Sequence, residues 1–101
     1  MMHTAEPYYL LDCGHALSGW KVWQKKTFDF ARQFDGQLFT RSEIDGFRSR
    51  LNDIAATCKN YEEVRPLDWE WAVKYGGNPS ISIGYGCSVS FRPIKGFYDG
   101  V

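Results

Sequence analysis

The sequence predicts a small α+β domain in which one amphipathic helix packs on one face of an antiparallel sheet of about three to five strands. Two observations lead to this class. A helix signal occupies residues 41–59, and two stretches of alternating apolar and polar residues follow at 67–75 and 80–91. With 101 residues the chain has the size of one unit with its own core, so a single domain over 1–101 is expected.

The remaining strands are expected in the first 39 residues. The stretches PYYLLDC and SGWKVWQ are each rich enough in apolar and aromatic residues to form a strand. TFDFARQFDG fits either a strand that ends in an Asp-Gly turn or a short helix that stops at Gly36, and we prefer the strand. Because two strands alone are marginally stable, at least one of these segments has to complete the sheet.

The main helix begins at a strong N-terminal signal. Thr40 can cap the first turn, and Glu43 can reach back to the Thr40 amide, which is the pattern of a capping box. Phe39 and Ile44 have the spacing of a hydrophobic staple across the same boundary. Apolar residues then recur at three- and four-residue spacing and predict a helix over about 41–59. Its apolar face consists of Ile44, Phe47, Leu51, Ile54, Ala55 and Cys58.

Basic residues flank this apolar face. Arg41, Arg48 and Lys59 lie along one side of it, with Asn52 beside them. Long cationic side chains in such positions usually cover the edge of the core and keep their charges in water, and contact with an anionic partner is the alternative. Gly46 costs about 1 kcal/mol relative to alanine in a helix, and we interpret it as tolerated and not as the site of a close contact.

The last two elements are expected to pair as an antiparallel hairpin. Pro66 marks the start of the first strand, 67–75, because proline has no amide hydrogen for the ladder. In 80–91, serine and glycine occupy one face, which is either a close-packing or a binding surface. Since glycine weakens a strand, a bulge or close contact is expected at Gly84 and Gly86. The opposite face is predicted to be core and consists of Ile81, Ile83, Tyr85, Cys87, Val89 and Phe91.

The three cysteines give little support for chemistry. An odd number fits reduced thiols better than a disulfide framework. Cys13 and His15 would share a strand face and could pair as thiol and imidazole or bind a metal. Cys58 and Cys87 lie on core-facing stripes, where a free cysteine behaves as a small hydrophobic residue. We therefore assign no catalytic residue, no metal and no cofactor.

Charge and motifs narrow the function further. The 12 basic and 12 acidic residues balance, without a basic arm, which disfavours sequence-independent binding of nucleic acid. The longest apolar run, Tyr8 to Leu11, is far shorter than the roughly 20 residues that span a bilayer, and the start lacks a secretory pattern. A cytoplasmic protein without a membrane partner is therefore expected. No phosphate loop, dinucleotide fingerprint, zinc-protease motif or nucleophile elbow occurs, so we expect no enzymatic activity.

A surplus of aromatic residues is the positive functional signal. Aromatic residues form 17% of the chain, and tryptophan and tyrosine often anchor protein interfaces. Our first hypothesis is a small protein-binding module, such as a phage or mobile-element inhibitor, an antagonist of a protein target, or an immunity-type protein. The stretch WKVWQKK also interleaves aromatic and basic residues, so a single-stranded nucleic-acid binder is the alternative and a Cys/His enzyme the third hypothesis. The predicted partner-binding residues are Trp20, Trp23, Lys21, Lys25, Lys26, Arg41, Arg48 and Tyr8.

Overall fold

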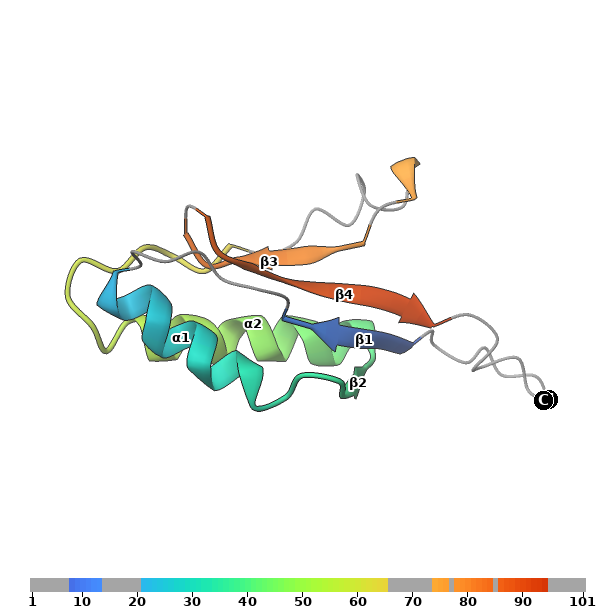
Figure 1. Ribbon diagram of the computed structural model, residues 1–101, viewed down its shortest axis with the longest axis horizontal. Helices are drawn as coiled ribbons and strands as arrows, with labels where there is room; N and C mark the ends of the chain where they lie inside the picture. Colours follow the sequence, from blue (N-terminus) through green and yellow to red (C-terminus); the bar gives the residue numbers. More distant parts are fainter. Residues whose placement is uncertain (1–7, 14–20, 66–73, 77, 85, 95–101) are drawn as a thin grey trace.

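In the part of the chain that the structure describes, two helices and one antiparallel sheet make up the fold (Figure 1). The computed structural model describes residues 8–13, 21–65, 74–76, 78–84 and 86–94. In chain order the elements are β1 (Tyr8–Asp12), α1 (Val22–Arg32), β2 (Leu38–Phe39), α2 (Arg41–Ala55), β3 (Ser80–Ser82) and β4 (Ser88–Ile94). The predicted α+β class is confirmed, and α2 is the predicted main helix.

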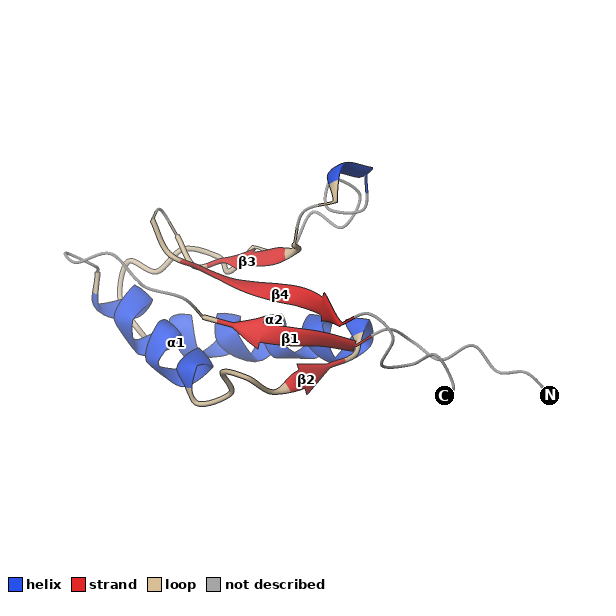
Figure 2. Cartoon of the chain, turned by 45° about the vertical axis from the view of Figure 1, so that its right-hand side comes forward, coloured by secondary structure: helices blue, strands red, loops and turns tan. Residues whose placement is uncertain are grey.

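The sheet has the strand order β2-β1-β4-β3, so β1 and β4 form its centre and β2 is an edge strand (Figure 2). Neighbouring strands are antiparallel throughout. Leu11 lies opposite Phe91, and Tyr9 lies opposite Phe39. Because side chains alternate along a strand, these residues point to the face that the helices cover, and Leu10 and Leu38 point to the other face.

The core lies between the sheet and both helices. Buried side chains of α1 and α2 join buried residues of β1, β3 and β4 in one apolar cluster. Its largest fully buried members are Trp23, Phe91, Leu11, Ile44, Leu51, Ile81, Ile83, Val64 and Val89. Burying each large side chain contributes roughly 1.5–3 kcal/mol, so this layer dominates the stability of the fold.

Helix α2 begins as predicted and ends earlier than predicted. The Thr40 hydroxyl accepts a hydrogen bond from the Glu43 amide at 3.3 Å, and the Glu43 carboxylate accepts one from the Thr40 amide at 2.8 Å. After Ala55 the backbone tightens: the Thr57 amide bonds to the Ile54 carbonyl and the Cys58 amide to the Ala55 carbonyl. These three-residue bonds end the helix four residues before the predicted position 59.

The predicted N-terminal strands are confirmed only in part. PYYLLDC contains β1, but the described parts of SGWKVWQ and TFDFARQFDG are not strands, because helix α1 runs through both from Val22 to Arg32. Trp23, Thr27, Phe28 and Ala31 form its buried face with helical spacing, which is hidden when the two stretches are considered separately. The turn after α1 ends at Gly36, which has a φ of 85°, so the helical alternative was the correct one.

The C-terminal hairpin is confirmed, but its strands are not the predicted ones. The stretch 80–91 folds back on itself, so that β3 and β4 are the two strands of the hairpin. The predicted first strand cannot extend to position 75, since Lys74 and Tyr75 lie in a helical turn, and 67–73 lies outside the described residues. In the turn, the Ile83 amide bonds to the Cys87 carbonyl at 2.9 Å.

The predicted core face of this stretch is nevertheless confirmed. Ile83 and Cys87, which are hydrogen-bonded to one another, keep the alternation in phase, so residues on both sides of the reversal face the helices. Ile81, Ile83, Cys87, Val89 and Phe91 are all buried, and Tyr85 lies outside the described residues. The close contact expected at Gly84 is also present, because a Cβ there would lie 2.7 Å from Gln24 Nε2 and 2.9 Å from a ring carbon of Trp23.

Substitution of two of the glycines with positive φ, Gly36 and Gly84, should separate backbone strain from overpacking. Both Gly84 (φ 77°) and Gly36 (φ 85°) are strained as alanine, but only Gly84 has neighbours within 4 Å of the added methyl group. We expect Gly36→Ala to cost about 1–2 kcal/mol of unfolding free energy and Gly84→Ala about 1–3 kcal/mol more. Urea denaturation of both variants measures this difference, and equal losses would contradict the packing of α1 against this turn.

Candidate functional site

The structure scatters the predicted partner-binding residues. Tyr8 is half-buried at the start of β1, and Arg41 is exposed at the start of α2. Lys25 is exposed and its ammonium group lies 2.9 Å from the Asp29 carboxylate. Trp20 lies outside the described residues. The described members of the predicted set therefore do not all lie at one site.

Trp23 is a correction to the sequence prediction. Its side chain is only 1% exposed, because it lies on the inner face of α1 and packs against the turn at Gly84. The indole Nε1 has no hydrogen-bond acceptor among the residues that the structure describes. The prediction that the Trp23 ring contacts a partner or stacks on a base is therefore wrong.

The Arg48 side chain makes a hydrogen bond within the chain. Its guanidinium donates a hydrogen bond to the Val64 carbonyl at 3.2 Å, and the Asn52 side chain accepts one from the Val64 amide at 3.0 Å. Val64 is fully buried, so the two side chains of α2 hold the segment after the helix against the core. This pairing accounts for Arg48 without an external partner.

The remaining lysines lie at a cavity between the start of α1 and the end of α2. We call it the lysine pocket: it has a volume of about 800 Å³ and is lined by Lys21, Val22, Trp23, Thr57, Cys58, Lys59 and Asn60. Lys26 reaches its rim, where the ammonium group donates a hydrogen bond to the Thr57 hydroxyl at 3.1 Å. Among the residues that the structure describes, no acidic side chain lines it, and α1 has none in its first turn, so the positive end of the helix dipole adds to the lysine charges.

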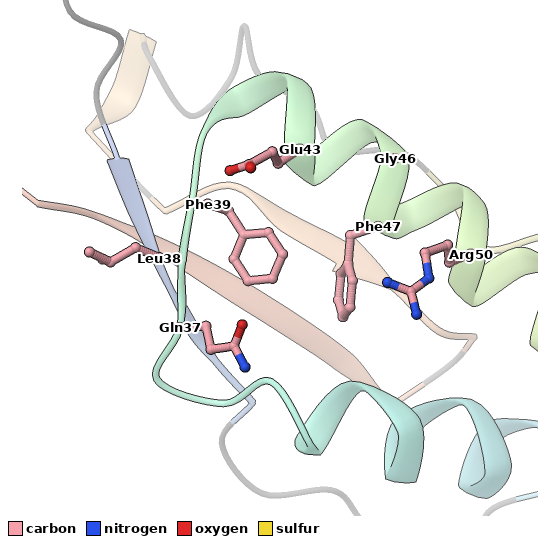
Figure 3. Close-up of a pocket in the computed structure, with 7 residues that line it drawn as sticks. All are labelled: Gln37, Leu38, Phe39, Glu43, Gly46, Phe47 and Arg50. Carbon is pink, nitrogen blue, oxygen red and sulfur yellow. The ribbon is translucent and has the colours of Figure 1, made fainter.

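A second cavity lies between edge strand β2 and helix α2 (Figure 3). We call it the β2–α2 groove: it measures about 370 Å³ and is lined by Gln37, Leu38, Phe39, Glu43, Gly46, Phe47 and Arg50. Phe39 comes from the edge strand and Phe47 from the helix, and their ring centres lie 5.1 Å apart. The two rings form an apolar floor, and the open position of Gly46 lies in the helical wall.

Charges lie at opposite ends of the β2–α2 groove. Glu43 is in the first turn of α2, where its carboxylate is engaged by the Thr40 amide. Arg50 lies seven residues further along the helix, about 10 Å by the helical rise. Its guanidinium carbon lies 5.1 Å from the ring centre of Phe30 and 5.6 Å from that of Phe34, so aromatic stacking fixes the cation.

Sequence reasoning missed the groove completely. It assigned Phe39 and Phe47 to packing and Gly46 to tolerance, and none of the predicted partner-binding residues lines the cavity. The tolerance of Gly46 is confirmed, because no atom of the described residues lies within 4 Å of the Cβ that another residue would have there. The available signal was a glycine on a helix flank between an aromatic core residue and charged neighbours, which gains meaning only when a strand lies opposite.

Cys13 and Cys87 are buried, which opposes a nucleophilic role for their thiols, whereas Cys58 is only half-buried. Desolvation raises the pKa of both Cys13 and Cys87 to about 11, and for Cys13 the charges of Asp35 and Asp12 add to this effect. A thiol of this kind stays protonated at neutral pH and is a poor nucleophile. His15, the proposed partner of Cys13, lies outside the described residues, and the described part of the chain holds no group of three potential metal ligands.

Alkylation tests this assignment of the thiols. At about pH 8 iodoacetamide should modify half-buried Cys58 first and the buried Cys13 and Cys87 only slowly, as mapped by mass spectrometry. Preferential labelling of Cys13 would contradict the assignment.

The same two buried thiols should make stability depend on pH. Because the folded pKa values of Cys13 and Cys87 lie above the ordinary 9.0, the thiols of the unfolded chain ionise first, and the unfolding free energy should fall as pH rises from 9.0 to about 11. The fall should be smaller in Cys13→Ala.

Comparison with known proteins identifies no relative of this chain. No protein-family model matches the chain, and neither a curated protein nor a solved structure does. Among the described residues, neither helix has the length and apolar character needed to cross a membrane. The lysine pocket and the β2–α2 groove are therefore the observations on which the functional proposals rest.

Proposed function

We propose that this chain is a non-enzymatic protein-binding module whose partner binds in the β2–α2 groove. The observation that carries the proposal is an open apolar cavity at the edge of the sheet, with an aromatic floor and a fixed cation at one end. Interfaces are enriched in aromatic residues and arginine at their centre, which is the composition of this groove.

The floor of the groove is preorganised. Phe47 is only 3% exposed, and its ring packs edge-on against Phe34 and Phe91, with ring centres 5.4 and 6.4 Å apart. Rings that are already fixed by the core lose little conformational entropy when a partner binds. Preorganisation of this kind raises affinity without additional contact area.

Gly46 keeps the mouth of the groove open. Its φ is not positive and no neighbour crowds it, so neither the backbone nor the core requires glycine there. Alanine would stabilise the helix by about 1 kcal/mol at such a position. A glycine that costs stability without a structural need is consistent with a binding role for the space beside it.

The more specific parts of the proposal come from the sequence. An inhibitor, antagonist or immunity-type role in the cytoplasm remains our prediction for the biological setting. The burial of the thiols supports the non-enzymatic part, because Cys13 and Cys87 are unsuited to nucleophilic chemistry at neutral pH.

Filling the groove should abolish partner capture. We expect Gly46→Trp to place an indole over Phe39 and Phe47 and to lose the protein that wild type retains from lysate, as identified by quantitative mass spectrometry. Ser49→Trp is the matched control, because Ser49 is exposed on α2 and does not line the groove. Gly46→Ala controls for the helix itself and should raise the unfolding free energy by about 1 kcal/mol. Equal capture by Gly46→Trp and Ser49→Trp would reject the groove as the binding site.

The lysine pocket supports a second candidate function, the binding of single-stranded nucleic acid. Lys21 and Lys59 line the cavity, Lys26 lies at its rim, and no carboxylate of the described part of the chain lines it to offset them. A chain of zero net charge therefore concentrates positive charge locally. Since Trp23 is buried, this site would act on phosphates through charge and not through stacking on that ring.

Charge reversal distinguishes this candidate from the first. If the lysine pocket binds phosphates, Lys59→Glu should weaken the shift of single-stranded RNA or DNA oligomers and reduce the salt dependence of binding by about one unit of slope. Lys25→Glu is the control, because Lys25 is paired with Asp29 and does not line the pocket. Equal effects of the two variants, or no binding by wild type, would reject nucleic-acid binding and leave the first proposal unaffected.

A further inference from the structure

We infer that the β2–α2 groove binds an extended peptide segment that carries a large apolar side chain and, two residues away, a carboxylate. The apolar side chain would lie on the floor formed by Phe39 and Phe47, and the carboxylate would pair with Arg50. This inference rests on the proposed function and specifies the chemistry of the partner. Three features of the groove lead to it: the strand at its edge, its floor and its cation.

The edge strand favours an extended partner. The Leu11 amide donates to the Gln37 carbonyl at 3.0 Å, and Leu10 is paired with Leu38. Because hydrogen-bonded and non-bonded pairs alternate in an antiparallel ladder, the backbone groups of Leu38 point away from β1, toward the free edge of β2. An incoming strand can pair with this edge, and every second side chain of that strand then faces α2.

The floor of the groove favours a large apolar side chain. Phe39 and Phe47 present aromatic surface to a cavity of about 370 Å³, and Gly46 adds no side chain that would fill it. Burial of a leucine or phenylalanine side chain contributes roughly 1.5–3 kcal/mol. A short polar side chain would leave most of this cavity unfilled.

Arg50 favours a carboxylate beside that side chain. Its guanidinium is held over Phe30 and Phe34, and no described carboxylate lies within ion-pair distance of it. A planar guanidinium presents paired donors that match a carboxylate. Glu43, at the other end of the groove, repels a second acidic group, so the charges also fix the direction of the peptide.

The two-residue spacing follows from geometry. Phe47 and Arg50 are three residues apart on α2, an axial separation of about 4.5 Å. Side chains two residues apart on an extended chain share a face and lie about 6.8 Å from one another. A flexible acidic side chain can therefore reach Arg50 while its neighbour occupies the floor.

Capped octapeptides test the inference with the intact chain. One fixed leucine or phenylalanine is followed, two residues on, by aspartate, asparagine or lysine, and binding is followed by amide NMR titration. We expect the aspartate peptide to bind about five-fold more tightly than asparagine and about ten-fold more tightly than lysine, in line with one partly exposed ion pair. Shifts should centre on Leu38, Gly46 and Arg50, because these residues line the groove.

Variants make the test specific to the groove. Arg50→Glu should reverse the preference so that the lysine peptide binds best, and Arg50→Gln should remove the preference with little effect on the exposed helix surface. Gly46→Trp should abolish binding of all the peptides, whereas Ser49→Trp should leave it unchanged. Amide spectra and urea denaturation confirm that each variant is folded.

Several results would overturn the inference. Equal affinities of the aspartate and lysine peptides, or shifts centred on the lysine pocket, would exclude Arg50 as the selecting group. Self-association that Gly46→Trp removes, without peptide binding, would identify a second copy of the chain as the occupant. If wild type captures a protein through the groove but binds no peptide, the inference fails and the proposed function stands. If capture does not depend on the groove, the proposed function fails as well.

Discussion

The mutual packing of three phenylalanine rings holds α2 against the β2 edge of the sheet. Phe47 of α2 lies 5.1 Å from Phe39 of β2 and 6.4 Å from Phe91 of β4, and Phe39 lies 5.7 Å from Phe91, all between ring centres. One cluster of three rings therefore holds the helix α2, the edge strand β2 and the central strand β4 together. Because this contact also fixes the floor of the β2–α2 groove, the stability of the fold and the geometry of the candidate site have the same physical origin.

A different set of contacts holds the start of α1 against the hairpin of β3 and β4. Trp23 is buried beside the hairpin turn, and the Gln24 side chain donates a hydrogen bond to the Ile83 carbonyl at 3.0 Å. Gly84 leaves room for both side chains, which a methyl group at this position would displace. This packing changes the meaning of the aromatic surplus. Rings that composition alone assigns to recognition, Trp23 above all, serve the core, and the candidate site is formed by the partly exposed edges of that core.

The two cavities differ in the kind of ligand that they favour. The lysine pocket combines several cations with the start of a helix and suits a diffuse anionic surface. The β2–α2 groove combines an apolar floor with one oriented arginine and suits a single side chain with a defined neighbour. The second arrangement is the more selective, because a misplaced or reversed charge would leave Arg50 or Glu43 without compensation. A net charge of zero hides both features, since it records only the sum over the chain.

The sequence by itself determined the features that arise between near neighbours in the chain: the capping box of Thr40 and Glu43, the apolar face of α2, strand β1, and the alternation that buries one face of 80–91. It did not determine that 80–91 turns at Gly84, because alternation with small residues fits one strand or two, and the choice depends on what packs against the turn. Helix α1 was only the less favoured alternative, and for part of its length, since its buried face becomes visible only when 22–32 is considered as one segment. The groove depended on tertiary structure entirely. Its two walls are contiguous in sequence but form a cavity only because the core draws α2 across the edge strand, and no local pattern encodes the space left between them.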